Sequence, residues 1–485
     1  MDNYVTICAA ALQKLPSPRK SLCILVGSTI LSACATVQAP DFSQDRNFEV
    51  RQEWAAFTSD QPRLIDNNWL GSFGSPKLIA LVNEALINNR DLRATSARVV
   101  EAQAIARRAG ADLSPAVNAT ASVGTENEFD SATDPRDTVS LGLSAEWEVD
   151  VWNSILNGRN AAALDAVSQE RLFESARLSI AAQVTDAWLV ANANHALLGI
   201  AREEVSERAS TLRMVQARVA ERSALGVDEN RARANLAVAR ADAIEAERIL
   251  KESVRVIEVL LGRFPDAHSD VYAPLPRLSS NVTAGLPAEL LERRPDVIAA
   301  ERAVAAAFFR VEEAKAARLP RLTLSASITA QDEDLESALD PANVVWGLVG
   351  GRIAPILVGG ELEENLNIAT ARQQSALESY AQTALVAFRE VEDALANQGY
   401  FVRELQQQQV AAQQFRETIT AEEERFEAGE IVLFRLADTR TRLFDARRAV
   451  INARLAHLRN RVALPLALGG SFSAAQATAD TNGYG

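Results

Sequence analysis

The chain has 485 residues, of which 24% are charged, and a formal net charge of −14. This acidic balance argues against nucleic-acid binding, which needs a basic surface. No phosphate-binding loop, dinucleotide fingerprint or nucleophile elbow is present. The candidate metal ligands are few and scattered: His195, His268, His457, Cys8, Cys23 and Cys34. The sequence therefore gives no support for an enzyme or a metal site.

Residues 1–33 are typical of a lipoprotein signal peptide. A basic region (Lys14, Arg19, Lys20) precedes an apolar core, residues 22–31, that is too short for a stable membrane span. Leu31-Ser-Ala-Cys34 resembles a bacterial lipobox, in which Cys34 becomes the lipidated first residue; an ordinary signal peptide is the alternative. Loss of residues 1–33 removes three basic groups and one acidic group, which leaves a net charge of −16. Residues 34–68 are expected to form a lipidated, extended segment.

The rest of the sequence repeats itself. Residues 90–115 map onto 295–320 with an offset of 205, and Val184-Thr-Asp-Ala187 maps onto Val391-Glu-Asp-Ala394 with an offset of 207. Self-similarity at a fixed period indicates a repeated structural unit. We therefore predict two tandem copies with few insertions. The boundaries are residues 69–264 for repeat 1, 265–285 for the linker, 286–470 for repeat 2 and 471–485 for a disordered tail.

Each repeat is predicted to begin with a short helix and two strands. The helices are expected at about 76–112 and 287–317, and the strand pairs within 116–152 and 321–358. The clearest strand is 138–152, where apolar residues alternate with polar and acidic ones. The other strands are expected at 117–124, 322–329 and 343–358. Such alternation suits a barrel with lipid outside and water inside. A soluble sandwich with one wet face is the alternative.

Four strands cannot close a barrel, and open sheet edges are not tolerated in lipid. Several chains must therefore share one barrel, and three chains would supply about twelve strands. No run of 18 apolar residues follows Cys34, so the sequence predicts no transmembrane helix.

Two long stretches, about 158–262 and 362–468, are rich in strong helix formers and lack proline until their ends. Folded as hairpins, they would give helices of about 60 and 40 residues, or roughly 90 and 60 Å. Gly429 fits the turn of the second hairpin. The offset of 207 places Arg222 at the first turn, with Gly226 four residues on, so we expect the first tip to be built differently. An isolated coiled-coil rod is the alternative.

Gly285-Leu-Pro-Ala-Glu-Leu-Leu-Glu-Arg-Arg-Pro-Asp-Val-Ile-Ala-Ala-Glu301 closely resembles a signature of the outer-membrane factor family, the TolC-like and OprM/NodT-type efflux lipoproteins. Asn89-Arg-Asp-Leu92 and Trp147-Glu-Val-Asp150 also match. The resemblance covers essentially all of 35–470. It implies an α+β membrane protein: a homotrimer with a twelve-stranded outer-membrane barrel continuous with a periplasmic helical tunnel.

The resemblance also implies partners and a mechanism. The chain would be lipid-anchored in the outer membrane, with a large periplasmic portion. An inner-membrane pump and a periplasmic adaptor would meet it at the helical tips, around Gly429, Arg222 and Gly226. It would conduct drugs or other small solutes passively, without catalysis and without a cofactor beyond the lipid on Cys34. An exit duct for type I protein secretion has the same architecture and is the alternative. A periplasmic adaptor is disfavoured by the duplication.

In this family acidic residues ring the pore at the periplasmic tip, and Asp438 matches that position. Phe434 matches a constriction residue, whereas Arg435 stands where some members carry a second Asp. Asp228 and Arg231 match Arg435 and Asp438 in the first repeat. We hypothesise that the opposite charges of neighbouring tips pair across a closed gate. The charge of −16 and the acidic strand faces favour cations in the channel.

Overall fold

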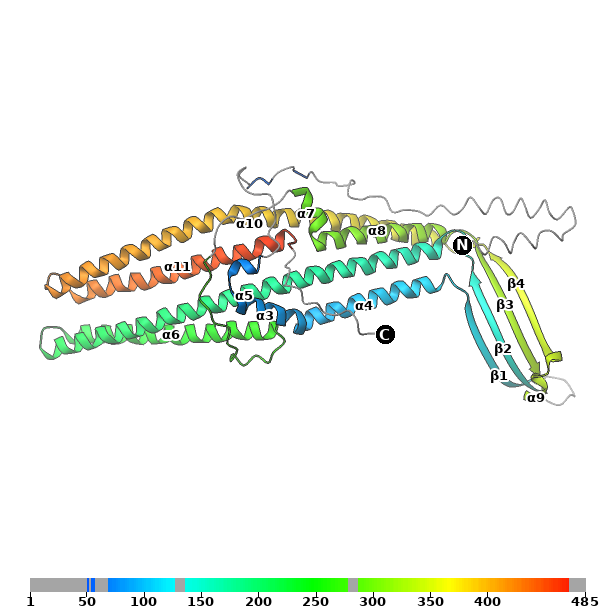
Figure 1. Cartoon of the computed structure of the whole chain (residues 1–485), viewed down its shortest axis with the longest axis horizontal. Helices are drawn as coiled ribbons and strands as arrows, with labels where there is room; N and C mark the ends of the chain where they lie inside the picture. The colour runs from blue at the N-terminus through cyan, green and yellow to red at the C-terminus, as the bar shows by residue number, and fades with distance from the viewer. Residues whose placement is uncertain (1–49, 52–53, 57–68, 127–135, 278–286, 471–485) are drawn as a thin grey trace. The chain divides into compact units, whose positions relative to one another are not determined.

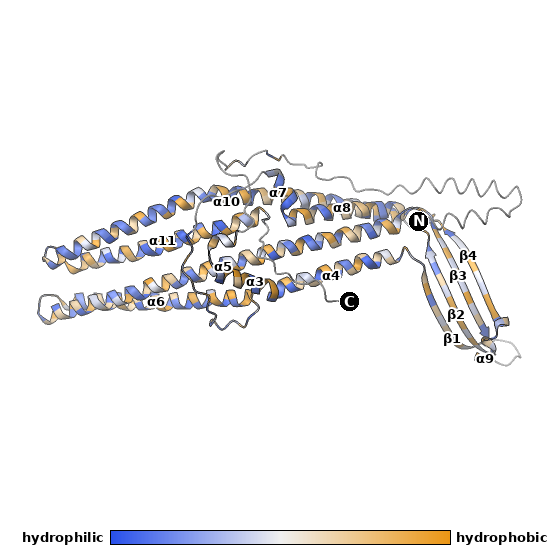
Figure 2. Ribbon diagram, viewed as in Figure 1, coloured by the Kyte–Doolittle hydropathy of each residue, from blue (hydrophilic) through white to orange (hydrophobic). Residues whose placement is uncertain are grey.

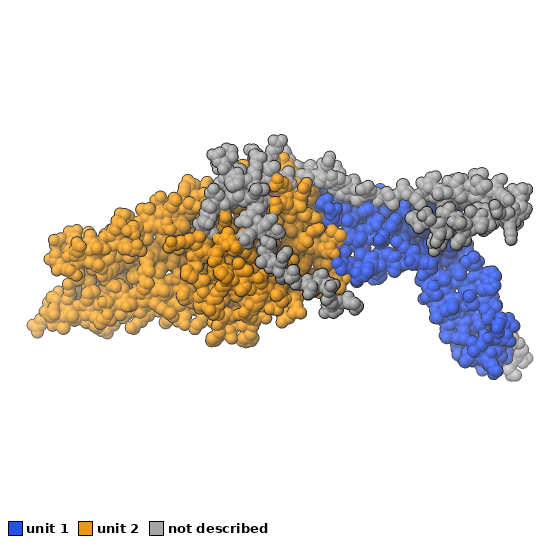
Figure 3. All heavy atoms as spheres, in the orientation of Figure 1, with its two compact units in different colours: residues 1–45, 102–166, 301–378 blue, residues 46–101, 167–300, 379–485 orange. Residues whose placement is uncertain are grey.

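The computed structural model describes residues 50–51, 54–56, 69–126, 136–277 and 287–470. The predicted signal peptide, Cys34, most of the segment 34–68 and the predicted tail 471–485 lie outside the described residues. The chain divides into two compact units (Figure 3). Described residues of unit 1 come from 102–166 and 301–378, and those of unit 2 come from 46–101, 167–300 and 379–485.

The order of the main elements repeats along the chain (Figure 1). The first half, within 69–264, contains α3 (Pro76–Asn88), α4 (Arg90–Ala111), β1 (Ala116–Glu126), β2 (Arg136–Glu148), α5 (Ser154–Ala220) and α6 (Gly226–Leu260). The second half, within 286–470, contains α7 (Pro287–Arg293), α8 (Pro295–Ala316), β3 (Arg321–Asp332), α9 (Leu335–Ala338), β4 (Val344–Ile353), α10 (Glu361–Glu427) and α11 (Leu433–Ala467). α4 and α8 have 22 residues each, α5 and α10 have 67, and α6 and α11 have 35. The predicted hairpins are confirmed. Among the described residues, no helix is both long and apolar enough to cross a membrane.

Each short helix that the sequence predicts as continuous is instead broken in two. The first break lies at Asn89, whose Oδ1 accepts a hydrogen bond from the N–H of Leu92 and so caps α4. The second lies at Arg294, because the residue before a proline is disfavoured in the helical conformation and Pro295 begins a new helix. The predictions of single helices over 76–112 and 287–317 were therefore wrong at these two positions.

The strands of unit 1 form one antiparallel sheet in the order β1-β2-β3-β4, which confirms two strands from each half. The register places Val117 beside Ala145, Leu143 beside Ile328 and Ile328 beside Trp346. One face is therefore apolar across all four strands. Its residues are Val117, Ala119, Ala121 and Val123 of β1, Val139, Leu141, Leu143, Ala145 and Trp147 of β2, Leu322, Leu324, Ala326, Ile328 and Ala330 of β3, and Val344, Trp346 and Leu348 of β4. On the other face Ser and Thr are the commonest residues of β1, β2 and β3, whereas β4 carries Val345, Val349 and Ile353 there. Figure 2 shows the resulting alternation of hydropathy along the strands.

Two of the strands end earlier than predicted, β2 at Glu148 and β4 at Ile353. Beyond β2 the chain turns, and the Asp150 carboxylate accepts a 2.7 Å hydrogen bond from the N–H of Leu156 in α5. The Trp147 indole donates to the carbonyl of Leu113, after α4, at 3.1 Å. The Trp147-Glu-Val-Asp150 motif thus joins β2 to the helices on either side of it in the sequence.

Unit 2 is centred on α5, which buries Trp188, Leu189 and Val184 completely. The segment 265–277 is held against this core by hydrogen bonds. The Trp188 indole donates to the carbonyl of Val271 at 2.9 Å. The buried Glu258 carboxylate accepts from three successive backbone N–H groups, those of Ala267, His268 and Ser269.

A clasp of the same geometry closes the base of each hairpin. The Asn89 amide donates to the carbonyl of Leu260 at 2.9 Å, and the Arg294 guanidinium donates to the carbonyl of Ala467 at 3.1 Å. Arg294 also pairs with Asp296 at 2.8 Å and Glu390 at 2.6 Å. Although burial alone would lower it, these hydrogen bonds and charges hold the pKa of Arg294 above its usual value. The 285–301 signature therefore contains the residue that fastens the second hairpin.

Candidate functional site at the hairpin tips

The two hairpins turn in the same way. Arg222 and Gly429 both adopt the left-handed conformation, with φ of 61° and 79°. The N–H of Ser223 bonds the carbonyl of Arg218 at 2.8 Å, and the N–H of Glu430 bonds that of Arg425 at 2.9 Å. The expectation of a differently built first tip was therefore wrong, because Arg222 accepts the strained conformation that glycine adopts freely. Gly226 is the first residue of α6.

Apolar and aromatic contacts join the two tips within one chain. Val215 of α5, Ala232 of α6 and Leu433 of α11 form a small buried cluster. The guanidinium of Arg218 lies 4.8 Å from the centre of the Phe426 ring. The guanidinium of Arg231 lies 4.9 Å from the centre of the Phe434 ring. These two arginines of the first hairpin each therefore make a cation–π contact with a phenylalanine of the second, an arrangement worth about 0.5–1 kcal/mol at exposed sites.

The acidic residues of the tips have other partners than those predicted. Asp438 pairs with Arg442 at 3.0 Å, four residues along α11. Asp228 accepts a hydrogen bond from the backbone N–H of Leu225, at the start of α6. A carboxylate in the first helical turn is well placed for this role, so local capping competes with pairing between tips. Within one chain the predicted Asp–Arg pairs between tips do not form, and pairing between copies stays a prediction.

Arg435 is bound to the second hairpin itself. Its Nε donates to Oε1 of Glu422 on α10 at 3.0 Å. Glu422 is buried, with 6% of its surface exposed, and its Oε2 atom has no hydrogen-bond partner. The Arg435 side chain is 59% exposed. The pair thus hides its negative end and presents its positive end to solvent.

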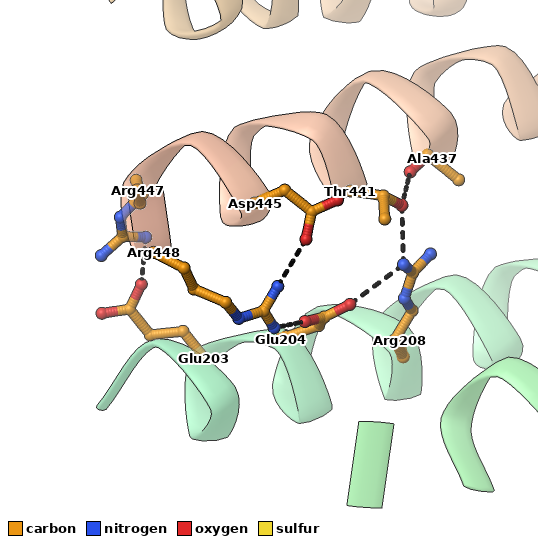
Figure 4. Close-up of polar contacts among 8 residues, drawn as sticks. All are labelled: Glu203, Glu204, Arg208, Ala437, Thr441, Asp445, Arg447 and Arg448. Atoms are coloured by element: carbon orange, nitrogen blue, oxygen red, sulfur yellow. Dashed lines mark hydrogen bonds and ion pairs between the residues drawn. The ribbon is translucent and has the colours of Figure 1, made fainter. Parts of the chain in front are cut away.

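Further from the tips, α5 and α11 are joined by a network of ion pairs (Figure 4). Arg448 lies between Asp445 of its own helix, at 2.8 Å, and Glu204 of α5. Glu204 also accepts from Arg208, which in turn donates to the Thr441 hydroxyl at 2.6 Å. Because the Glu204 side chain is only 9% exposed, its charge depends on these two arginines.

Arg440 extends the network to a third helix. Its guanidinium contacts Glu207 of α5 and Glu423 of α10, the latter at 2.6 Å. One arginine therefore links the first hairpin to both helices of the second. Sequence reasoning missed this network. Its signal lies in the acidic run 203–207 and the basic residues at 440–448, which fall at similar distances from the two tips.

Comparison with known proteins identifies the architecture. The outer membrane efflux protein family matches residues 81–263 and 286–470. The chain belongs to this family. It is 32% identical over 469 residues to the pyoverdine export outer membrane protein OpmQ of Pseudomonas aeruginosa, covering 93% of this chain and 97% of that protein. It is 26% identical over 464 residues to the cation efflux system protein CusC of Escherichia coli K12, covering 94% and 100%.

Solved structures agree with this assignment. The outer-membrane channel OprN superposes with a TM-score of 0.81 at 25% identity, covering 90% of this chain and 98% of that chain. The predicted family, efflux function and outer-membrane location with a large periplasmic portion are therefore confirmed. Efflux proteins among the relatives favour efflux over the alternative of a protein-secretion duct.

Proposed function

We propose that three copies of this chain form a continuous passive duct, with a twelve-stranded barrel in the outer membrane and a tunnel of helices in the periplasm. The apolar face of the sheet supports this proposal. Val123, Trp346 and Leu348 are 81%, 76% and 71% exposed in the single chain. β1 and β4 leave two open edges, which lipid does not tolerate. Pairing of β4 with β1 of the next copy would satisfy both edges.

The proposed duct is built from a duplicated chain. The family match to two successive segments, 81–263 and 286–470, supports repeats at 69–264 and 286–470 joined by the linker 265–285. The equal lengths of three helix pairs, α4 and α8, α5 and α10, and α6 and α11, support them as well. Cys34 would carry the lipid anchor after removal of residues 1–33. The names of the relatives support export of small solutes. The proposed system would also include a periplasmic adaptor and an inner-membrane pump. The adaptor would contact the tips at Arg222, Gly226 and Gly429.

The proposed gate is the exposed Asp438, one copy from each chain, with Phe434 as the apolar constriction beside it. The Asp438 side chain is 64% exposed, and its partner Arg442 is equally open. Exposed ion pairs are individually worth about 0–1 kcal/mol. A gate held by three ion pairs of this strength between neighbouring copies could be opened by a binding partner.

Planar-bilayer conductance of the purified protein, wild type beside Asp438→Ala, tests this function. A small wild-type conductance that rises in the variant supports both the duct and the gate. Equal and substantial conductance in both would retain the duct and reject Asp438 as the gate. Analytical ultracentrifugation in detergent gives the oligomeric state of the same sample. A protein that is monomeric there and gives no conductance would overturn the proposal of a duct.

A further inference from the structure

The tip half of α11 has one exposed stripe. Between residues 432 and 445, the exposed positions are 432, 435, 438, 442 and 445. Spacings of three and four place them on one face of the helix. Leu433 and Leu436, in contrast, are buried. The most exposed residues of α11 near the proposed gate are therefore those of this stripe.

The stripe alternates in charge. Val432 is followed by Arg435, Asp438, Arg442 and Asp445. The last three are paired along the helix, Asp438 with Arg442 at 3.0 Å and Asp445 with Arg448 at 2.8 Å. An acidic ring would need aspartates without a neighbouring cation. This stripe is charge-balanced instead.

Within this stripe, the charge nearest the tip turn is positive, and its side chain is held in place. Arg435 precedes Asp438 by three residues, about 4.5 Å along the helix axis, on the side of the tip turn. Its counter-ion Glu422 has a side chain that is 9% exposed, against 59% for Arg435. The buried Glu422 carboxylate therefore orients the Arg435 side chain from inside the hairpin. Along the exposed stripe of α11, the guanidinium of Arg435 therefore comes before the carboxylate of Asp438, and the carboxylate of Glu422 is buried behind it.

We propose that Arg435 makes the periplasmic constriction of the duct permissive to anions, so that the channel exports solutes carrying carboxylate or other anionic groups, zwitterions included. This inference rests on the proposed duct and on Asp438 lining its tip. Three copies would place three guanidinium groups at the entrance, next to the three aspartates. Rings of charged side chains set the selectivity of a pore, and here the two rings oppose each other. The cation preference that the overall charge favours is thereby cancelled at the narrowest point.

The test is the ratio of potassium to chloride permeability, obtained from the reversal potential of the reconstituted protein in a potassium chloride gradient. We expect a ratio near one for the wild type. Arg435→Gln, which keeps a donor for Glu422, should raise the ratio about threefold, because one fixed cation per chain is lost. The double variant Glu422→Gln/Arg435→Asp should raise it by a factor on the order of ten. Circular dichroism verifies that each variant is folded.

Arg425→Gln is the matched control. Arg425 lies at the same tip but on α10, where it pairs with Glu430, and its side chain is 53% exposed. Its loss should leave the ratio unchanged. An unchanged ratio in both Arg435 variants, or an equal shift in Arg425→Gln, would overturn the inference while leaving the duct intact. A protein that is monomeric and gives no conductance, both as wild type and as Asp438→Ala, would instead reject the duct, and this inference with it.

Discussion

The two halves of the chain share a backbone plan but differ in the chemistry that fastens it. Three pairs of their helices have equal lengths, α4 and α8, α5 and α10, and α6 and α11. Their tips turn at positions 207 residues apart, Arg222 and Gly429. At the hairpin base, however, the first half uses the neutral Asn89 where the second uses the charged Arg294. The same carbonyl of the last helical turn is bound in both, Leu260 and Ala467. The two hydrogen bonds therefore lie at equivalent positions of the two halves, but the donor is an amide in the first half and a guanidinium in the second.

The two hairpins also differ in the polarity of side chains at equivalent positions between their helices. Ala191 and Leu250 are buried in the apolar core of the first half. Their counterparts 207 residues on are Gln398 and His457, whose side chains contact each other at 3.0 Å. The segment 265–277 covers the first half, whereas Trp54 and the backbone N–H of Ala55 contact Phe388 and Glu392 in the second. One backbone plan thus carries an apolar pair at these positions in the first half and a polar pair in the second.

The largest expected effect concerns the clasp. Arg294→Ala removes the donor to the carbonyl of Ala467 and leaves Asp296 and Glu390 without their partner. We expect a loss of about 3 kcal/mol, because breaking a buried ion pair strands the remaining charges. Asn89→Ala should cost about 1 kcal/mol, the value of a helix cap. Thermal unfolding followed by circular dichroism compares the two variants. Equal losses would show that the two clasps carry the same energy and that the charge adds nothing.

The tip turns offer a reciprocal exchange. Arg222→Gly should stabilise the protein by up to about 1 kcal/mol, because a left-handed conformation is costly for a residue with a Cβ atom. Gly429→Arg should destabilise it by a similar amount. A Cβ atom at Gly429 meets no neighbour within 4 Å, so the backbone alone decides. Denaturant midpoints of both variants measure the difference. Destabilisation by Arg222→Gly would mean that the Arg222 side chain makes a contact worth more than the strain.

Much of the fold could be predicted from the sequence, because periodicity and length carry it. Alternation located all four strands, and the runs of helix formers located both hairpins. The repeat offset even identified Arg222 as the first turn. The breaks at Asn89 and Arg294 were missed, although a capping asparagine and a residue before a proline are local signals for them. The clasp hydrogen bonds from the same two side chains to distant carbonyls could not be predicted. Such contacts join residues more than 170 positions apart and leave no local pattern.

The candidate site was predictable in position but not in its contacts. Sequence reasoning placed Asp438, Phe434 and Arg435 at the second tip, and they lie there. The predicted pairing of acidic and basic residues between neighbouring tips was based only on their opposite charges. The structure shows that Asp228 caps its own helix and that Arg231 lies over Phe434 instead. Which side chain meets which across two hairpins depends on the packing of α5 against α11, and neither helix specifies this by itself.

The smallest expected effect is a difference in how the stability of the protein depends on pH with and without the polar pair Gln398 and His457. Burial, and then the charge of Arg461, lower the pKa of His457 below its usual value. A lowered pKa in the folded state means that His457 stabilises the fold above about pH 6.5. That contribution is lost as the pH falls through 6.5 toward the lower folded value. Gln398→Ala/His457→Leu gives the second half the residues of the first, Ala191 and Leu250. Between pH 7 and pH 5, roughly the range in which an ordinary histidine titrates, the wild type should therefore lose more stability than this variant. Parallel curves of unfolding temperature against pH would show instead that the polar interior of the second half does not sense protons.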